Sequence, residues 1–358
     1  MTPSAFQHKI LAWFDEQGRK DLPWQQNITP YRVWLSEIML QQTQVTTVIP
    51  YFNAFVEKFP TLESLASTPI DEVLPYWSGL GYYARARNLH KTAQIIHQQQ
   101  RFPDTLEELT ALAGIGQSTA GAILSIAFHK SHPILDGNVK RVLTRYKAIS
   151  GWTGSSEVTK QLWDISSELT PIKRCADYTQ AMMDLGATLC TRSKPACLIC
   201  PLTSHCLARI NGTVALLPTP KPKKIVPVKQ VIFLLLSNQD KHILLEKRPP
   251  TGIWGGLWSL PEFDSIDAAR DWCFTKNISI ASEQVLPSLR HTFSHYHLDY
   301  TPLVIQTNSP TNFVMEANQS LWYNVKLNLG LAAPIKQLLQ QHNTEHNYDQ
   351  TSTVRKIR

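Results

Sequence analysis

A segment rich in proline and lysine divides this chain into two parts with different hydrophobic patterns. Residues 217–230 contain four prolines, four lysines and no acidic residue. Proline fixes φ and lacks a backbone N–H donor, so this segment cannot continue a helix. We interpret it as an extended, basic linker between two domains. The length of 358 residues agrees with two domains rather than one small module.

Apolar residues recur with different spacing on the two sides of the linker. From Phe6 to Arg209 apolar residues recur at helical spacing, which predicts an all-helical domain of about ten helices over residues 1–216. Thr29 and Pro30 predict a helix start, and we expect that helix to run through Val45. After the linker, 231–236 and 243–246 are typical of strands, so residues 231–342 are expected to form an α+β domain. Residues 343–358 contain few apolar side chains and are expected to be a disordered tail.

Composition narrows the possible environments and partners. The apolar run at 231–236 is far shorter than the ~20 residues of a membrane helix, and the first ten residues lack the apolar core of a signal peptide. We expect a cytoplasmic protein without a membrane partner. The net charge of +7 permits a polyanionic partner without requiring one.

Four of the six cysteines fall in one short window. Cys190, Cys197, Cys200 and Cys206 form a Cys-x6-Cys-x2-Cys-x5-Cys series. A disulfide framework is not expected in a cytoplasmic chain, whereas four thiolates at this spacing suit either structural zinc or a four-iron four-sulfur cluster. Zinc ribbons usually contain two Cys-x2-Cys knuckles and this chain has one, which favours the cluster.

Residues 112–121 form a glycine-containing turn. Gly114 and Gly116 follow a helical segment rather than a strand, so they are not a dinucleotide-binding fingerprint. One interpretation is a hairpin between helices whose backbone N–H groups hold a phosphate. The other is simply a tight turn between packed helices.

Two acidic residues are candidates for catalysis. Asp136 stands just before a predicted helix, where an acid is often only a cap; Gly137 follows it, and Asn138 is a plausible N-cap. Glu37 lies among apolar neighbours, so burial is expected to raise its pKa and favour the protonated form. Gln41 lies one helical turn beyond Glu37, on the same face.

Several motifs, in this order, resemble those of the MutY-type adenine DNA glycosylases, within the helix-hairpin-helix superfamily that also contains endonuclease III. The motifs are residues 36–43 (SEIMLQQT), 79–88 (GLGYYARARN), the hairpin, 135–139 (LDGNV), the cysteine series and 293–295 (FSH). The family usually has proline where this chain has Ala113, which should leave the turn intact. The resemblance covers nearly the whole chain and implies a helical glycosylase domain with an iron-sulfur cluster loop, followed by a Nudix-like domain.

The resemblance implies excision of adenine mispaired with 8-oxoguanine or guanine in double-stranded DNA, as part of base excision repair. Glu37 would protonate the flipped adenine as general acid, Asp136 would stay ionised and stabilise the oxocarbenium-like sugar, and Asn138 would orient the water or Asp136. Endonuclease III has a lysine nucleophile where this chain has Ser118, so a monofunctional glycosylase is implied.

Other residues are expected to contact the substrate. Gln41 and Tyr82 would fill the vacated base stack, Gln42 would lie beside the lesion, and Trp24 would line the adenine pocket or the core. The other residues expected to contact DNA are Gly114, Gly116, Ser118 and Lys140. Phe293, Ser294 and His295 of the Nudix-like domain would read 8-oxoguanine, and the acidic signature of Nudix hydrolases is absent after Glu262.

The same resemblance implies one four-iron four-sulfur cluster held by the four cysteines, and a monomer associated with the nucleoid. Two alternatives compete with this hypothesis. One is a bifunctional glycosylase and lyase acting on oxidised pyrimidines, against which Ser118 and the long second domain argue. The other is a DNA-binding protein that has kept the fold and lost the reaction, against which Glu37 and Asp136 argue.

Overall fold

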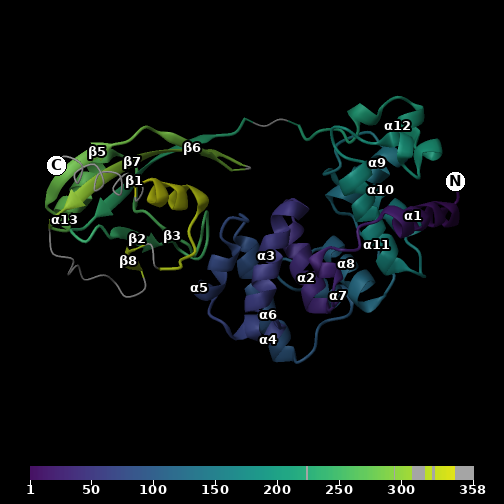
Figure 1. Cartoon of the computed structure of the whole chain (residues 1–358). Helices are drawn as coiled ribbons and strands as arrows, with labels where there is room; N and C mark the ends of the chain where they lie inside the picture. Colours follow the sequence, from purple (N-terminus) through teal and green to yellow (C-terminus); the bar gives the residue numbers. More distant parts are fainter. Residues whose placement is uncertain (223–224, 294, 309–318, 325–326, 343–358) are drawn as a thin grey trace, which may run out of the picture. The chain divides into compact units, whose positions relative to one another are not determined.

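The computed structural model describes residues 1–222, 225–293, 295–308, 319–324 and 327–342. The chain divides into two compact units, one helical and one rich in strands (Figure 1). The first comprises Met1–Thr68 and Arg87–Lys223, and the second comprises Pro69–Ala86 and Lys224–Arg358. Ser294 and the tail at 343–358 lie outside the described residues.

The first unit is helical, as the apolar spacing predicts. Its helices are α1 (Pro3–Gln17), α2 (Pro30–Leu40), α3 (Val45–Lys58), α4 (Leu62–Ser67), α7 (Leu106–Thr110), α8 (Gln117–Phe128), α9 (Gly137–Tyr146), α10 (Ser156–Leu169), α11 (Cys175–Asp184) and α12 (Leu207–Ile210), together with most of α6 (Ala84–Gln99). A π-helical turn, Leu185–Leu189, continues α11. The buried residues Phe6, Leu143 and Leu162 form part of a core shared by α1, α9 and α10.

Thr29 and Pro30 start α2 as expected, with the Thr29 side chain accepting a hydrogen bond from the Arg32 backbone N–H. The expectation that this helix continues to Val45 is wrong. It ends at Leu40 because the chain turns at Gln42, whose φ of 57° is left-handed, and α3 then begins at Val45.

Residues 69–86, which the helical spacing assigned to the first domain, are grouped with the second unit. They contain α5 (Ile70–Val73). The Ser78 and Tyr83 hydroxyls both donate to the backbone carbonyl of Leu331 at 3.1 Å. A pattern of apolar spacing shows that a helix has a buried face, but not which partner covers it.

In its described residues the second unit contains an eight-stranded sheet. Its strands are β1 (Val228–Ser237), β2 (Ile243–Lys247), β3 (Trp258–Ser259), β4 (Glu262–Phe263), β5 (Ile280–Val285), β6 (Leu289–Thr292), β7 (His297–Thr307) and β8 (Ser320–Tyr323). The order along the main path is β3-β2-β1-β7-β5, while β4 pairs with β1, β6 with β7 and β8 with β2. β1 and β7 run parallel, from Val228 opposite His297 to Ser237 opposite Gln306.

Helices accompany this sheet. α13 (Ile266–Thr275) is capped by Ser265, and a further helix covers 333–342. Ala269 and Cys273 of α13 are buried against Leu234 and Leu303 of the sheet. The strand β1 begins at Val228, so the last residues assigned to the linker by sequence are part of the sheet.

Candidate active site

The first unit encloses a cavity of about 400 Å³, a size typical of small-ligand sites. It gathers residues from distant parts of the chain. Seven of the predicted site residues line it: Trp24, Glu37, Gln41, Gln42, Ser118, Asp136 and Asn138. We refer to it below as the base cavity.

Glu37 reaches the base cavity from α2. Its side chain is partly buried, and its sequence neighbours Leu35, Ile38 and Met39 are buried as well. Burial, together with the negative charge of Asp136, raises the pKa of Glu37 to about 8. The carboxyl group is therefore protonated at neutral pH, and it can donate a proton to a bound molecule.

Asp136 is the N-cap of α9, a position that the sequence analysis gave to Asn138. Its Oδ1 accepts a hydrogen bond from the Val139 backbone N–H at 2.7 Å, and its Oδ2 accepts one from the Asn138 side chain at 3.1 Å. Burial raises the pKa of Asp136, whereas these hydrogen bonds and the charge of Arg141 lower it. The residue both caps the helix and presents a carboxyl group to the cavity.

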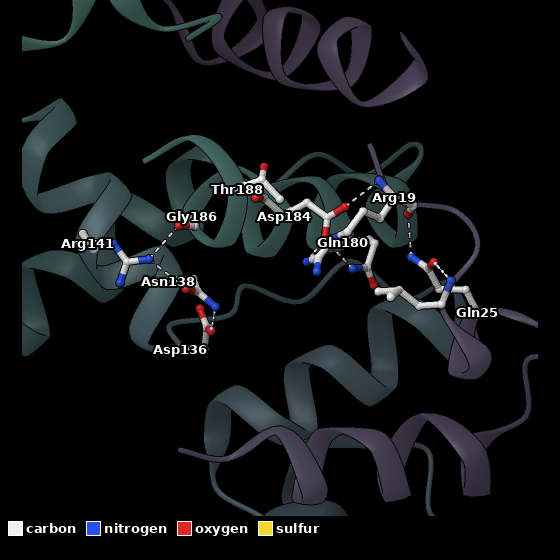
Figure 2. A network of polar contacts seen from close by, with 10 residues as sticks. Arg19, Gln25, Asp136, Asn138, Arg141, Gln180, Asp184, Gly186 and Thr188 are labelled. Carbon is white, nitrogen blue, oxygen red and sulfur yellow. Dashed lines mark hydrogen bonds and ion pairs between the residues drawn. The ribbon is translucent and has the colours of Figure 1, made fainter. Parts of the chain in front are cut away.

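Arg141 holds Asn138 in place. Its Nη2 donates to Asn138 Oδ1 at 2.8 Å and to the Gly186 carbonyl at 2.7 Å (Figure 2). Gly186 lies in the π-helical turn, where an added Cβ would stand 2.5 Å from the Asn138 Cβ. Only glycine fits there without displacing Asn138.

A second polar network, which the sequence motifs do not predict, reaches the cavity from α11. Asp184, which is fully buried, pairs with Arg19 Nη2 at 2.6 Å and accepts a hydrogen bond from Gln180 at 3.1 Å (Figure 2). Arg19 and Gln180 both line the cavity. The signal available in the sequence was an acidic residue between Met183 and Leu185 on an apolar helix, since a buried carboxylate needs a cationic partner.

The glycine turn does join two helices, as expected, because α7 and α8 pack together on either side of it. Gly114 has a φ of 83°, and an added Cβ would lie 3.1 Å from the Asn88 Cβ, so this position requires glycine. Gly116 is the N-cap of α8 and is exposed. The Ser118 hydroxyl accepts a hydrogen bond from the Leu135 backbone N–H at 3.0 Å and so links α8 to the loop before Asp136.

The remaining predicted residues lie elsewhere. Tyr82 is exposed in the second unit, has a left-handed φ of 50°, and lies beside Arg85, with 5.4 Å between guanidinium and ring. Lys140, on α9, lines a different cavity. Trp24 lines the base cavity and is also part of the core, because its buried ring packs edge-on against Phe52.

Phe293 and His295 belong to an aromatic group in the second unit. The Phe293 ring lies 4.6 Å from His291, 5.3 Å from Trp254 and 4.7 Å from Tyr296, between centroids. His295 is exposed at its edge. Trp254 is buried, and its ring packs against Phe293.

The four clustered cysteines are partly buried and free of disulfides. Burial, with the charges of the other three thiols, raises the pKa of Cys200 to about 11, so the four groups lie within electrostatic range of one another. The Arg145 guanidinium donates to Cys190 Sγ at 3.4 Å. In the described part of the chain no three Cys, His, Asp or Glu side chains converge tightly enough to hold one metal ion. Four cysteine thiols in one short segment are a donor set that suits soft metal centres, either iron-sulfur or zinc.

Comparisons with known proteins decide the family. Residues 35–168 match the HhH-GPD superfamily of base excision DNA repair proteins, and residues 232–341 match the NUDIX domain. The chain is 42% identical to the adenine DNA glycosylase of Buchnera aphidicola from Acyrthosiphon pisum, over 95% of this chain and 98% of that one. The chain belongs to the adenine DNA glycosylase family. It is 32% identical to the adenine DNA glycosylase of Rattus norvegicus, over 96% of this chain and 78% of that one.

Solved structures agree with the fold of this adenine DNA glycosylase. A thermostable thymine-DNA glycosylase is similar with a TM-score of 0.51 and 27% identity, over 58% of this chain and 97% of that one. The structure of a non-covalent endonuclease III–DNA complex is similar with a TM-score of 0.50 and 20% identity, over 59% of this chain and 98% of that one. The expected fold class, a helix-hairpin-helix domain followed by a Nudix-like domain, is therefore confirmed.

As an adenine DNA glycosylase, the chain is a DNA-binding hydrolase of N-glycosyl bonds that acts in base excision repair. None of the described helices is long and apolar enough to span a membrane.

Proposed function

We propose that this enzyme excises adenine opposite 8-oxoguanine, and opposite guanine, through acid-catalysed hydrolysis in the base cavity. One observation carries the proposal. Glu37, with a pKa raised to about 8, and Asp136, whose hydrogen bonds oppose the rise in pKa that its burial causes, line the same cavity. Acid-assisted glycoside cleavage uses one protonated and one ionised carboxyl group, and we infer these two states for Glu37 and Asp136.

The reaction begins with a flipped nucleotide whose adenine enters the cavity. Glu37 donates its proton to N7 of the adenine, and the C1′–N9 bond breaks with its electron pair leaving on the base. The developing positive charge on the sugar is stabilised by the Asp136 carboxylate. Water then attacks C1′, and its proton returns to Glu37 or passes to solvent, giving free adenine and an abasic sugar. Asn138 orients Asp136 and the water.

The lining of the cavity supports a purine ligand. Arg19 and Gln180 supply hydrogen-bonding groups held by the buried Asp184, and Trp24 supplies an aromatic wall. Because Asp184 already fixes the Arg19 and Gln180 side chains, these groups lose little conformational freedom when a ligand binds. This favours selective hydrogen bonding to one edge of a purine base.

A monofunctional reaction is supported by what the cavity lacks. Every residue that lines it is described, and no lysine is among them. The Ser118 hydroxyl, at the position of the lysine nucleophile in endonuclease III, accepts a hydrogen bond from Leu135. No amine is therefore available there to form a Schiff base with the abasic sugar.

For recognition of the opposite base, we propose that Phe293, Ser294 and His295 read 8-oxoguanine. The aromatic support of Phe293 and the exposure of His295 agree with this role. Gln41, Gln42 and Tyr82 would occupy and flank the vacated stack. The exposed backbone at Gly114 and Gly116, at the start of α8, would hold phosphate.

We also propose that Cys190, Cys197, Cys200 and Cys206 hold one four-iron four-sulfur cluster. Bound there, the cluster would supply soft iron centres that stabilise the loop over 190–206. We expect the purified enzyme to be yellow-brown and to contain about four irons. A colourless protein with one zinc would contradict this assignment.

Single-turnover assays test the proposed chemistry. Wild type should release adenine from duplexes with 8-oxoguanine opposite faster than from duplexes with guanine opposite. Glu37→Gln and Asp136→Asn should each lower the rate constant by about 10²-fold or more, because general acid catalysis alone contributes about 10²–10⁴-fold. Equal rates in all three proteins would refute the carboxylate roles. Strong borohydride trapping without adenine release would indicate the bifunctional alternative.

The same assay tests lesion reading in the full chain. Phe293→Ala should reduce the preference for 8-oxoguanine over guanine. Deletion of the second domain is a poorer test, because residues 69–86 bond to Leu331 and would lose partners.

A further inference from the structure

The backbone around Tyr82 has an unusual conformation. Gly79, Gly81 and Tyr82 have φ values of 107°, 72° and 50°, so three of four successive residues lie in the left-handed region. Glycine adopts this conformation at no steric cost, whereas tyrosine does so only where its surroundings fix it. Tyr82 itself is 49% exposed, so its backbone is fixed mainly by the residues beside it. We refer to residues 79–83 as the Tyr82 turn.

Arg85, in the first helical turn of α6, contacts the Tyr82 turn in three places. Its Nη2 donates to the carbonyls of Leu80 at 3.2 Å and Gly81 at 3.3 Å. The guanidinium lies 5.4 Å from the centre of the Tyr82 ring and 5.5 Å from the centre of the buried Trp77 ring, distances at which a cation and an aromatic face attract each other. One side chain thus bonds the backbone that precedes Tyr82 and also contacts the Tyr82 ring.

Tyr83 attaches the Tyr82 turn to the sheet of the second unit. Its hydroxyl, in a side chain only 7% exposed, accepts a hydrogen bond from the Gly79 backbone N–H at 3.3 Å and donates one to the Leu331 carbonyl at 3.1 Å. Leu331 is held in turn, because it forms a parallel bridge with Trp258 of β3. The Tyr83 hydroxyl therefore joins the first residue of the turn to a strand at the end of the main sheet path.

We propose that Arg85 and Tyr83 are positioning residues that hold Tyr82 ready for insertion into the base stack. The proposal rests on the role of Tyr82 given under the proposed function and deepens it. Insertion of a ring has to act against the energy that keeps the bases stacked. A ring whose backbone is fixed before DNA binds loses little conformational freedom on insertion, so more of its contact energy is available to open the stack.

The φ of Tyr82 is the quantity that these contacts control. Because φ and ψ set the direction of the Cα–Cβ bond relative to the flanking chain, a return of Tyr82 to the right-handed region would redirect its ring. The competing explanation for Arg85 is that its charge binds a phosphate directly. Lysine at this position separates the two explanations, since it keeps the charge but lacks the planar guanidinium.

A double-mutant cycle in the full-length protein tests the proposal. The variants are Tyr82→Ala, Arg85→Lys, Tyr83→Phe, and Tyr82→Ala combined with each of the other two. Tyr31→Phe is the matched control, because it also removes a buried tyrosine hydroxyl, one that donates to the Phe59 carbonyl at 2.9 Å. The measurement is the single-turnover rate constant for adenine release from a duplex with 8-oxoguanine opposite. Thermal unfolding shows that each variant is folded.

We expect Arg85→Lys and Tyr83→Phe each to lower this rate constant by about threefold to tenfold, the size of one lost hydrogen bond. In the Tyr82→Ala background the same substitutions should have no further effect, because both residues act through the Tyr82 ring. Tyr31→Phe should release adenine at the wild-type rate. A general loosening of the fold would instead lower the rate constant by the same factor with and without the Tyr82 ring.

Two results would overturn the proposal. One is a wild-type rate in Arg85→Lys or Tyr83→Phe while Tyr82→Ala slows release, because the residue concerned would then have no positioning role. The other is full additivity in the cycle, which would make the effects independent of Tyr82. A wild-type rate in Tyr82→Ala is a distinct outcome: it would contradict the proposed role of Tyr82 itself, and this proposal with it.

Discussion

Asn138 donates a hydrogen bond from its side-chain nitrogen to Oδ2 of Asp136 at 3.1 Å. The other end of the same amide accepts from Arg141, whose Nε also donates to the backbone carbonyl of Cys190 at 2.7 Å. One guanidinium therefore connects the candidate catalytic loop to the first cysteine of the series. The two contacts define which way the Asn138 amide faces, since its oxygen must meet Arg141 and its nitrogen must meet Asp136.

Substitution of Arg141 by lysine should separate geometry from charge. Lysine keeps the positive charge but lacks the planar guanidinium that bonds Asn138, Gly186 and Cys190 at once. We expect the single-turnover rate constant for adenine release to fall about tenfold or more, as for other residues that orient a reactive group. Affinity for abasic duplex should change much less. Lys147→Arg, at the far end of α9, is the matched control; a wild-type rate in Arg141→Lys would rule out the positioning role.

The pH dependence of adenine release should report Glu37. Its pKa is raised to about 8, and the protonated form is the active one, so the rate constant should hold through neutral pH and decline above about pH 8. Protonation of Asp136, whose pKa is also raised, should lower the rate on the acid side. The measurement is the rate constant from acid to alkaline pH. In Glu37→Gln, its decline above about pH 8 should be absent. An alkaline limb that persists in this variant would assign it to another group.

Glu37 should also lower the stability of the fold. Its ordinary pKa of 4.5 rises to about 8 in the folded chain, so between these values the folded state binds more protons than the unfolded state. Stability contributed by this group therefore decreases as pH rises from about 4.5 to 8. Glu37→Gln should raise the free energy of unfolding by about 2 kcal/mol near pH 7 and by less near pH 5.

Urea unfolding at both pH values measures this effect. Glu16→Gln, an exposed change on α1, should stay within about 0.5 kcal/mol of wild type. A destabilised Glu37→Gln protein would mean that the carboxyl group makes favourable contacts that outweigh its burial.

Trp254 should matter for lesion preference although it is buried. Its ring centre lies 5.3 Å from that of Phe293. The Arg248 guanidinium, which pairs with Glu262 at 2.9 Å, lies 5.8 Å from the centre of the same Trp254 ring. Trp254→Leu should reduce the preference for 8-oxoguanine over guanine by about threefold to tenfold, the range of one aromatic contact. Trp272→Leu, which removes a ring packed on Phe263 instead, should leave the preference intact. Equal losses in both variants would indicate general loosening of the domain.

The local sequence pattern was sufficient to predict many features of this protein. The change from helical to strand spacing, the Thr29–Pro30 helix start, the hairpin turn and the spacing of the cysteines depend on neighbours within a few residues. Motif order was then enough to identify the family. Glu37 stood out for the same reason, because a lone acid in an apolar helix is visible in sequence alone.

Tertiary structure decided how these pieces meet. That Asp136 rather than Asn138 caps α9, that Asp184 holds Arg19 and Gln180 at the cavity, and that residues 69–86 bond to Leu331 all depend on contacts between segments far apart in the chain. The linker is the clearest case. Its prolines and lysines determine an extended basic segment, but only the buried Arg145 guanidinium, which donates to carbonyls of both the linker and the cysteine loop, fixes its first residue beside that loop.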